Sequence, residues 1–233
     1  MNIALVIAGG VGARMGGDVP KQFLYINGKY VIVYTLEAFQ KNPEIDAIGL
    51  VCVDGWIDTV WECAKQYGIT KLEFIVDGGR NGQESILKGL TEAKKRYSDE
   101  DIILVHDGVR PMVTQRIITD CIADTKEYGN AITCVPCQEA MLVTEDGVTS
   151  SQSYPRSRLK RTQTPQCFYI GDLWNLHQEA IAEGNTNSVS SCTLMVEMGR
   201  SVHMTLGSEK NIKLTTPDDL DIFETFLAVK NSK

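Results

Sequence analysis

The sequence lacks any apolar run that approaches the roughly 20 residues needed to cross a bilayer. It also lacks an excess of positive charge, because 30 Asp and Glu residues outnumber 23 Lys and Arg residues and leave a formal net charge of −7. This balance would repel a nucleic-acid backbone. We therefore expect neither a membrane nor a nucleic acid as partner, whereas a small phosphorylated ligand needs only a few well-placed cations.

Features of secreted and metal-binding proteins are also missing. The N-terminus shows no basic start and no small-residue cleavage site, so the expected location is the cytoplasm. The seven cysteines form an odd set scattered over apolar segments, which is typical of reduced thiols rather than of a disulfide framework. Cys134 and Cys137 form a CxxC pair, but no second pair accompanies them, and the three histidines show no metal-ligand spacing. We expect core cysteines and no zinc.

Short β-type runs alternate with helical periodicity through residue 137. The runs that predict strands are 2–7, 46–54, 72–79, 101–107 and 131–137, and those that predict helices are 30–42, 56–68, 83–97 and 114–129. Such alternation indicates right-handed βαβ crossovers. We predict a single α/β domain over residues 1–233, with a Rossmann-like, mostly parallel sheet and helices on both faces. Ligands of such sheets bind beyond the carboxyl ends of the strands.

The alternation breaks after Cys137. Residues 138–168 contain a turn signal at Asp146-Gly147, short apolar runs on either side, and too little apolar area to fold alone. We interpret this segment as a β-arm leaving the body, with a dimerisation arm at about 138–160 that a partner subunit covers. Further on, we expect helices at 170–184 and 190–199, a strand at 201–206, and a last helix with Thr216 as N-cap and Pro217 as first residue.

The stretch IAGGVGARMGGDVPKQF, residues 7–23, follows the first predicted strand and has three candidate interpretations. A dinucleotide-binding fingerprint needs glycine where Met15 stands, and no clear acidic residue follows about 20 residues later. A Walker A loop needs Lys and then Ser or Thr after Gly17, where Asp18 and Val19 stand. The third interpretation is a glycine turn whose backbone N–H groups bind an anion.

Two cations accompany this turn. Arg14 and Lys21 lie seven residues apart, and Pro20 restricts the backbone before the lysine. Fixed cations around a glycine turn suit a triphosphate whose charge grows during reaction.

The same stretch resembles the signature loop of the cytidylyltransferases that form CDP-activated polyols, the family of 2-C-methyl-D-erythritol 4-phosphate cytidylyltransferase and ribitol 5-phosphate cytidylyltransferase. The resemblance continues in order through GGRNGQESILKGL, VHDGVRP, RTQTPQCF and NIKLTTPDDL. It implies a nucleotidyltransferase fold, joining of CTP and a polyol phosphate with release of pyrophosphate, Mg²⁺ as cofactor, and a homodimer whose arms clasp the partner. Two other hypotheses stay open: a non-catalytic nucleotide-binding module, and an NAD-dependent oxidoreductase, which Met15 weakens.

The resemblance also implies roles for individual residues. The residues implied to stabilise the transferring phosphate are Arg14, Lys21 and Lys213. Those implied to bind the nucleotide are Ala8, Gly9, Gly10, Gly12, Gly79, Ser85 and Asp107, the last also near the Mg²⁺-bound phosphates. Those implied to bind the acceptor are Asp107, Arg156 and Thr164, of which Arg156 and Thr164 would bind its phosphate and Arg156 would serve the partner's site. We expect His106 to pack or to bond a loop, and Arg110 to order its loop.

Five positions depart from the pattern of the erythritol enzymes. Ala140 stands where they carry a threonine that touches the acceptor phosphate, and Gly82 stands in place of a usual arginine. Val189, Ser190 and Ser191 replace a Thr-Asp-Asp or Thr-Asp-Glu segment. The departures fall in the part of the family pattern that concerns the acceptor, whereas the part that concerns cytidylyl transfer is intact. They favour ribitol 5-phosphate or a close relative as acceptor, with 2-C-methyl-D-erythritol 4-phosphate as the alternative.

Overall fold

A seven-stranded, mostly parallel sheet forms the centre of the protein, for which a computed structural model describes residues 1–10 and 19–231. Its spatial order is β11-β7-β10-β6-β1-β4-β5. The strands are β1 (Asn2–Ala8), β4 (Ala47–Cys52), β5 (Leu72–Asp77), β6 (Ile102–Asp107), β7 (Asn130–Pro136), β10 (Lys160–Tyr169) and β11 (Met204–Leu206). Only β10 runs antiparallel to its neighbours among these described strands. The predicted mostly parallel sheet is confirmed.

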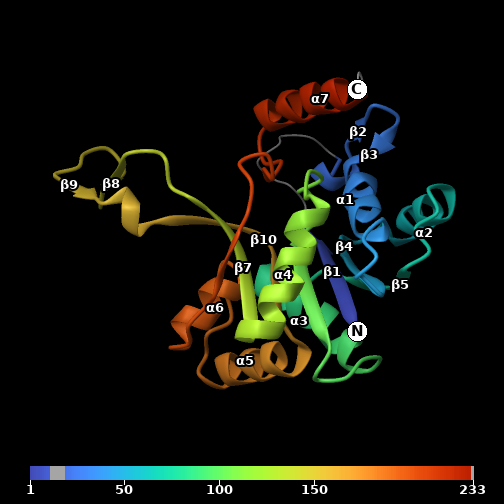
Figure 1. Cartoon of the computed structure of the whole chain (residues 1–233), viewed down its shortest axis with the longest axis horizontal. Coiled ribbons are helices and arrows are strands. Elements are labelled where there is room, and N and C mark those ends of the chain that lie inside the picture. Colours follow the sequence, from blue (N-terminus) through green and yellow to red (C-terminus); the bar gives the residue numbers. More distant parts are fainter. Residues whose placement is uncertain (11–18, 232–233) are drawn as a thin grey trace.

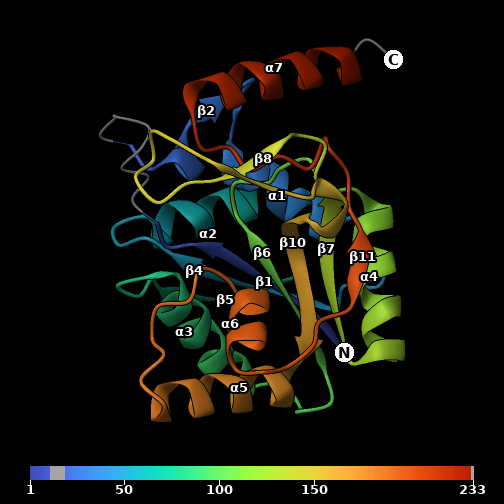
Figure 2. The same cartoon turned by 90° about the vertical axis from the view of Figure 1, so that its left-hand side faces the viewer.

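Helices cover both faces of this sheet (Figures 1 and 2). On one face α1 (Val31–Gln40), α2 (Ile57–Gln66) and α4 (Gln115–Tyr128) pack on one buried apolar cluster. On the other face α3 (Gly82–Lys94), α5 (Ile170–Ala182) and α6 (Ser191–Glu197) pack on a second. All seven cysteines are buried free thiols, as predicted. Within the described ranges, no helix has both the length and the apolar character that a membrane crossing requires.

Strand β10 corrects the predicted extent of the arm. From Lys160 onward the chain pairs with β7, and from Gln166 to Tyr169 it lies between β6 and β7, where Cys167 and Phe168 are buried. The run KRTQTPQCFY is largely polar and contains Pro165, which cannot donate to a ladder, so its pattern did not indicate a central strand. The pairing with β7 shifts register between Thr162 and Gln166, and this irregularity accommodates the proline.

A small hairpin was also missing from the sequence prediction. Strands β2 (Tyr25–Ile26) and β3 (Lys29–Tyr30) are joined by Asn27 and Gly28, whose φ angles are 45° and 84°. Two consecutive positive φ angles define the turn that Asn-Gly favours, so the dipeptide was a usable signal. The hairpin follows the short 3-10 helix η2 (Lys21–Phe23), whose Phe23 ring stacks on Trp56 with centroids 4.1 Å apart.

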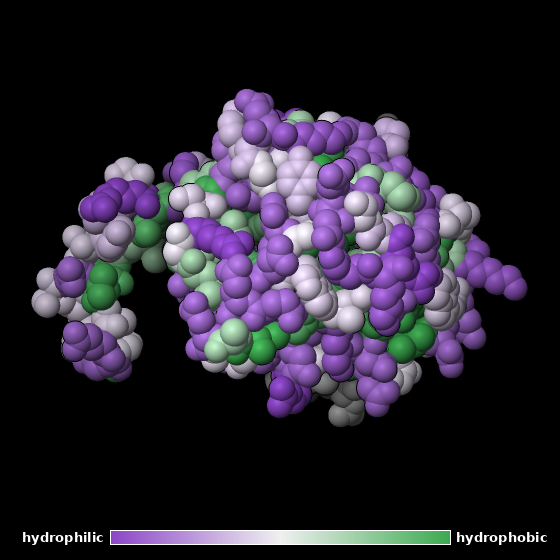
Figure 3. Space-filling view, turned by 90° about the horizontal axis from the view of Figure 1, so that it is seen from below, coloured by the Kyte–Doolittle hydropathy of each residue, from purple (hydrophilic) through white to green (hydrophobic). Residues whose placement is uncertain are grey.

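A two-stranded arm, β8 (Met141–Val143) and β9 (Gln152–Tyr154), stands off the body (Figures 1 and 3). The predicted turn at Asp146-Gly147 is present: Gly147 has φ 74°, and the Asp146 carboxylate accepts the N–H groups of Val148 and Thr149. The arm exposes apolar side chains that its own residues do not cover, with Leu142 66% and Val148 88% exposed. It returns to β10 through the 3-10 helix η3 (Arg156–Arg158).

The last helix, α7 (Pro217–Asn231), crosses the end of the molecule beside the β2-β3 hairpin (Figure 2). Its Phe223 joins Leu214, Ile26 and Val109 in a third apolar cluster. Thr216 Oγ1 accepts the N–H of Asp219, so the predicted cap is confirmed. This packing fixes the segment that precedes α7.

His177 on α5 is a buried histidine whose two ring nitrogens have no hydrogen-bond partner in the described part of the chain. It is 1% exposed, and burial lowers its pKa from 6.5 to about 4. The unfolded chain takes up this proton near the ordinary pKa, whereas the folded chain does so only near the lowered one. The folded state therefore loses stability as the pH falls through this window and is unaffected above it.

We expect His177→Leu to reduce this loss of stability in acid. Relative to wild type, the free energy of unfolding of the variant should be about 2 kcal/mol higher at about pH 5 than at about pH 8, because leucine takes up no proton in either state. Urea unfolding at both pH values measures the difference, and His203→Gln is the control for replacing a partly exposed histidine. An identical effect of His177→Leu at the two pH values would contradict the neutral, buried state of His177.

Candidate active site

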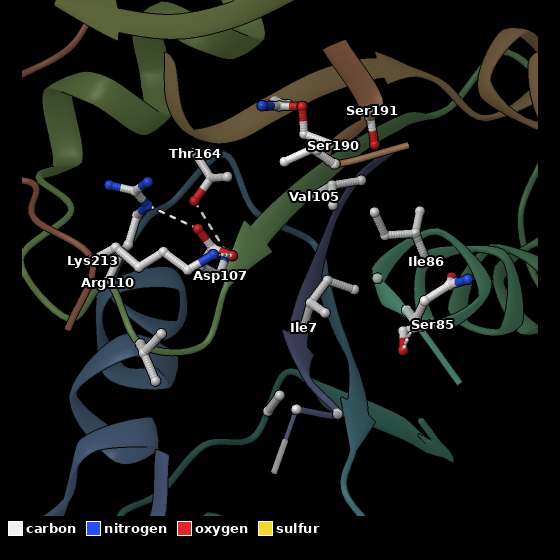
Figure 4. Close-up of a pocket in the computed structure, with 18 of the residues that line it drawn as sticks. Ile7, Ser85, Ile86, Val105, Asp107, Arg110, Thr164, Ser190, Ser191 and Lys213 are labelled. Carbon is white, nitrogen blue, oxygen red and sulfur yellow. Dashed lines mark hydrogen bonds and ion pairs between the residues drawn. The ribbon is translucent and has the colours of Figure 1, made fainter. Parts of the chain in front are cut away.

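A pocket of about 590 Å³ lies at the carboxyl ends of β1 and β6, where the order of the parallel strands reverses around β1. This is the position at which open α/β sheets bind ligands. Figure 4 shows side chains from β1, β6, α3, β10 and the segments before α6 and α7 converging on it. The pocket therefore lies beyond the strand ends, where the sequence predicts that ligands bind.

One wall of the pocket consists of glycine backbone and Ser85. A Cβ added to Gly79 would lie 2.7 Å from Ser85 N, so this position requires glycine, and one added to Gly9 would lie 3.0 Å from Gly78 Cα, a tight contact. Ser85 Oγ accepts the N–H of Gly79 at 2.9 Å and donates to Asn81 O at 2.8 Å. Asn81 in turn caps α3 by accepting the N–H of Glu84. The result is a rigid backbone surface against which a flat ring can lie.

Gln22 binds the backbone at the start of the glycine turn. Its side-chain amide donates to Ala8 O at 2.8 Å and to Gly10 O at 2.9 Å, and the residue is 1% exposed. Because Gln22 lies in η2, these bonds also fix Lys21, the preceding residue, beside the end of β1. Gln22 is not among the residues predicted from the sequence. The usable signal was a polar residue next to the candidate lysine.

The opposite wall carries a carboxylate between two cations. Asp107, at the end of β6, accepts from Arg110 Nε and from Lys213 Nζ, each at 2.9 Å (Figure 4). Burial alone would raise the pKa of Asp107, but attraction and hydrogen bonding by Lys213 and Arg110 outweigh it and lower this pKa to about 2. Arg110 Nη1 also donates to Asn211 O at 2.8 Å, which orders its loop as expected. The pocket therefore presents a permanently ionised, charge-compensated group.

Behind this wall, His106 is buried and contacts two pocket groups. Its Nδ1 lies 3.1 Å from Thr164 Oγ1 and its Nε2 lies 3.2 Å from Arg110 O. Its ring packs edge-on against Phe39, with centroids 4.9 Å apart. The expectation of packing and a loop hydrogen bond is confirmed. Burial lowers the pKa of His106 to about 4, so its ring is neutral at pH 7.

The structure brings most of the candidate residues together. Those that line this one pocket are Ala8, Gly9, Gly10, Lys21, Gly79, Ser85, Asp107, Thr164 and Lys213. Arg156 does not: it lies in η3 at the base of the arm, is exposed, and donates to Gln138 O at 2.8 Å. Gly12 and Arg14 fall outside the described residues. Each candidate role remains a prediction.

Four of the five departing positions line the same pocket, namely Gly82, Val189, Ser190 and Ser191, whereas Ala140 lies at the start of the arm. Ser190 Oγ accepts the N–H of Thr193 and caps α6. Ser191 Oγ is buried without a hydrogen-bond partner among residues 1–10 and 19–231. Ser190 and Ser191 place two small, neutral side chains above the strand ends (Figure 4).

Comparison with known proteins identifies the family. The family model of 2-C-methyl-D-erythritol 4-phosphate cytidylyltransferase (IspD) matches residues 2–229. The chain belongs to the IspD family. Its relatives include a ribitol-5-phosphate cytidylyltransferase of Lacticaseibacillus paracasei, 40% identical over 232 residues with 99% of both chains covered. They also include a 2-C-methyl-D-erythritol 4-phosphate cytidylyltransferase of Geotalea uraniireducens, 35% identical over 231 residues with 99% of this chain and 98% of the relative covered.

IspD-family structures have the same fold. The 4-diphosphocytidyl-2C-methyl-D-erythritol synthase of Anaerococcus prevotii matches with a TM-score of 0.82 at 22% identity, covering 97% of this chain and 96% of that one. The predicted nucleotidyltransferase fold is confirmed, and so is the prediction that the protein is a cytidylyltransferase.

We expect Gln22→Glu to weaken CTP binding. A carboxylate oxygen would face the carbonyl oxygens of Ala8 and Gly10, which repels the backbone at the start of the turn and leaves two acceptors unpaired. Calorimetry should show a Kd for CTP raised by at least about tenfold, and Gln22→Ala, which removes the donors without adding charge, a smaller rise of about threefold.

Gln40→Glu makes the same chemical change on the far side of α1, where Gln40 bonds Thr70 and Lys71, and it is the matched control. A folded Gln22→Glu protein with the Kd of the wild type would show that Gln22 does not shape the nucleotide site.

Proposed function

We propose that this protein joins CTP and ribitol 5-phosphate to give CDP-ribitol and pyrophosphate. One observation carries the proposal: the glycine wall and the cations of the pocket are present, while Gly82, Ser190 and Ser191 replace larger or acidic groups in the same pocket. A wall of small hydroxyl groups suits an acceptor with several hydroxyl groups along its chain. The 40% identical relative is named a ribitol-5-phosphate cytidylyltransferase, which agrees with this acceptor.

The reaction requires little proton transfer. A phosphate monoester has a second pKa of about 6, so the acceptor's phosphate is already an anionic nucleophile at pH 7 and needs no general base. Its oxygen forms the new bond to the α-phosphorus of CTP, and the bond from that phosphorus to the bridging oxygen of the leaving pyrophosphate breaks. The difficulty is holding two anions in line and stabilising the added charge.

Cationic side chains meet this requirement. Lys21 and Lys213 both line the pocket. Arg14 is the third cation proposed from the family pattern. We assign these three residues to the triphosphate and to the charge that develops at the α-phosphorus. The Asp107 carboxylate holds Lys213 in place before substrates bind, at 2.9 Å.

We also propose Mg²⁺ as the cofactor. Among the described residues that line the pocket, Asp107 is the one carboxylate, and no group of three or more potential metal ligands occurs within the described ranges. A hard divalent cation with few protein ligands is typically bound through substrate phosphates. The residues present fit such an ion, with Asp107 as its protein neighbour, and the ion would neutralise charge on the triphosphate.

A pyrophosphate-release assay tests the activity and the acceptor. With CTP and Mg²⁺, we expect ribitol 5-phosphate to give at least about tenfold higher kcat/KM than 2-C-methyl-D-erythritol 4-phosphate, because discrimination of hydroxyl groups by a hydrogen-bonding wall reaches this size. ATP, GTP and UTP should be poor substrates, and excess chelator should stop turnover. Faster turnover of the erythritol phosphate would make it the acceptor instead, and no turnover of either would favour a non-catalytic nucleotide-binding module.

We further propose a homodimer in which each arm completes the partner's site. The arm exposes Leu142 and Val148, and Arg156 at its base does not line the pocket of its own chain. Covering apolar side chains of this kind is the role of a second subunit. Arg156 would then bring a cation to the acceptor phosphate in the partner's pocket.

Mixing two inactive variants tests this arrangement. Lys21→Ala and Arg156→Ala proteins should each turn over slowly, and a heterodimer of the two should regain one complete site, because that site takes Lys21 from one chain and Arg156 from the other. We expect activity to rise by at least about tenfold on mixing. Mass spectrometry of isotope-labelled subunits confirms exchange, and exchange without recovered activity would mean that Arg156 serves its own chain.

A further inference from the structure

Three hydrogen bonds link the buried His106 to the pocket. Thr164 Oγ1 lies 3.0 Å from Asp107 N and 3.1 Å from His106 Nδ1, and His106 Nε2 lies 3.2 Å from Arg110 O. Thr164 lines the pocket and is partly exposed there, whereas His106 is fully buried. The chain of contacts therefore joins one pocket hydroxyl to a ring that no ligand can reach.

The two ends of this chain determine the direction of every bond in it. A backbone N–H can only donate, so Thr164 Oγ1 accepts from Asp107 N. A backbone carbonyl can only accept, so His106 Nε2 carries a hydrogen and donates to Arg110 O. In a neutral ring Nδ1 then has no hydrogen and accepts, and its donor is the Thr164 hydroxyl.

We propose that His106 is a positioning residue that takes the Thr164 hydroxyl hydrogen, so that Thr164 faces the pocket as an acceptor for a hydroxyl group of the polyol. The Thr164 oxygen has two lone pairs, of which Asp107 N–H occupies one and the pocket is left the other. A phosphate oxygen also accepts and is not a partner for that lone pair. This assignment differs from the phosphate contact that the family pattern implies for Thr164, and it rests on the proposed function for the identity of the acceptor.

The surroundings of His106 keep its ring in this state. The charged groups that face it are Asp107, Arg110 and Lys213, and the last two oppose a further positive charge, while Phe39 covers the ring edge-on. Burial is the largest influence and also disfavours the charged form. A doubly protonated ring would be needed to turn the Thr164 hydrogen toward the pocket while His106 still bonds Arg110 O.

Nitrogen NMR of the imidazole tests the bond directions without any substrate. In wild-type protein we expect a pyrrole-like Nε2 and a pyridine-like Nδ1 for His106 at pH 7, assigned by comparison with His106→Gln. A hydrogen on Nδ1 would overturn the proposal. Because the free protein is measured, this result is independent of which acceptor is turned over.

Two substitutions separate the two nitrogens. Asn can place its Oδ1 near the Nδ1 position and so still accept from Thr164, whereas Gln can place its Nε2 near the ring Nε2 and keep only the bond to Arg110 O. We expect His106→Gln and Thr164→Val each to raise the KM for ribitol 5-phosphate about five- to tenfold, and His106→Asn about twofold. The KM for CTP should change little in all three, and Thr164→Ser should retain the wild-type preference. Equal effects of His106→Asn and His106→Gln would indicate a structural role only.

Acceptors that each lack one chain hydroxyl identify the partner of Thr164. For one analogue, the KM of the wild type should rise by about the same factor as Thr164→Val raises the KM for the full acceptor. With that analogue, Thr164→Val should show no further rise in KM, as expected for two groups that contact each other. If Thr164→Val raises the KM for every analogue by the same factor, Thr164 contacts the phosphate and the proposal is wrong. A wild type inactive with ribitol 5-phosphate would refute the proposed acceptor instead, and the series would then be run on the acceptor that is turned over.

Discussion

The ion pairs of Asp107 hold together parts of the chain that are distant in sequence. Through Arg110 and Lys213, this one carboxylate joins the end of β6 to the segment before α7, more than a hundred residues later. Because the pKa of Asp107 is lowered, its ionised form stabilises the folded state by about 2 kcal/mol above pH 3.9. This stability is lost as the pH falls toward about 2. His106 acts in the same direction at higher pH, because its buried ring resists protonation between pH 6.5 and about 4. Acid therefore weakens this wall of the site in two successive steps.

The same carboxylate explains how the site tolerates cations before substrates arrive. Lys21 and Lys213 line one pocket, and cations gathered around a site without a counter-charge would repel one another and be costly to desolvate. Asp107 compensates Lys213 in the free protein, and incoming phosphates can take over that compensation when they bind. In the proposed reaction, Lys213 is thus already positioned near the developing negative charge, which is the condition under which electrostatic stabilisation needs little reorganisation.

How much of this could be predicted from the sequence differs from element to element. The strand from Asn2 follows from a continuous apolar run, and helix α4 follows from helical periodicity. The cap at Thr216 follows from local hydrogen bonding. Strand β10 could not be predicted in this way, since its polar residues and Pro165 become compatible with the sheet only through pairing with β6 and β7. In the site, residues with a chemical signature such as Asp107 were found from the motif. Gln22 and the Thr164–His106 contact were not, because their importance lies in which backbone and side-chain groups the folded chain places beside them.

The distribution of the departing residues follows from what the reaction demands of each wall. Bond formation at the α-phosphorus is the same for any phosphate monoester. The residues that bind the triphosphate therefore need not differ between enzymes with different acceptors. The acceptor's carbon chain takes no part in that chemistry. Its wall can therefore vary in size and charge without cost to the reacting centre. We propose that Gly82, Ser190 and Ser191, which all line the pocket, belong to this acceptor side.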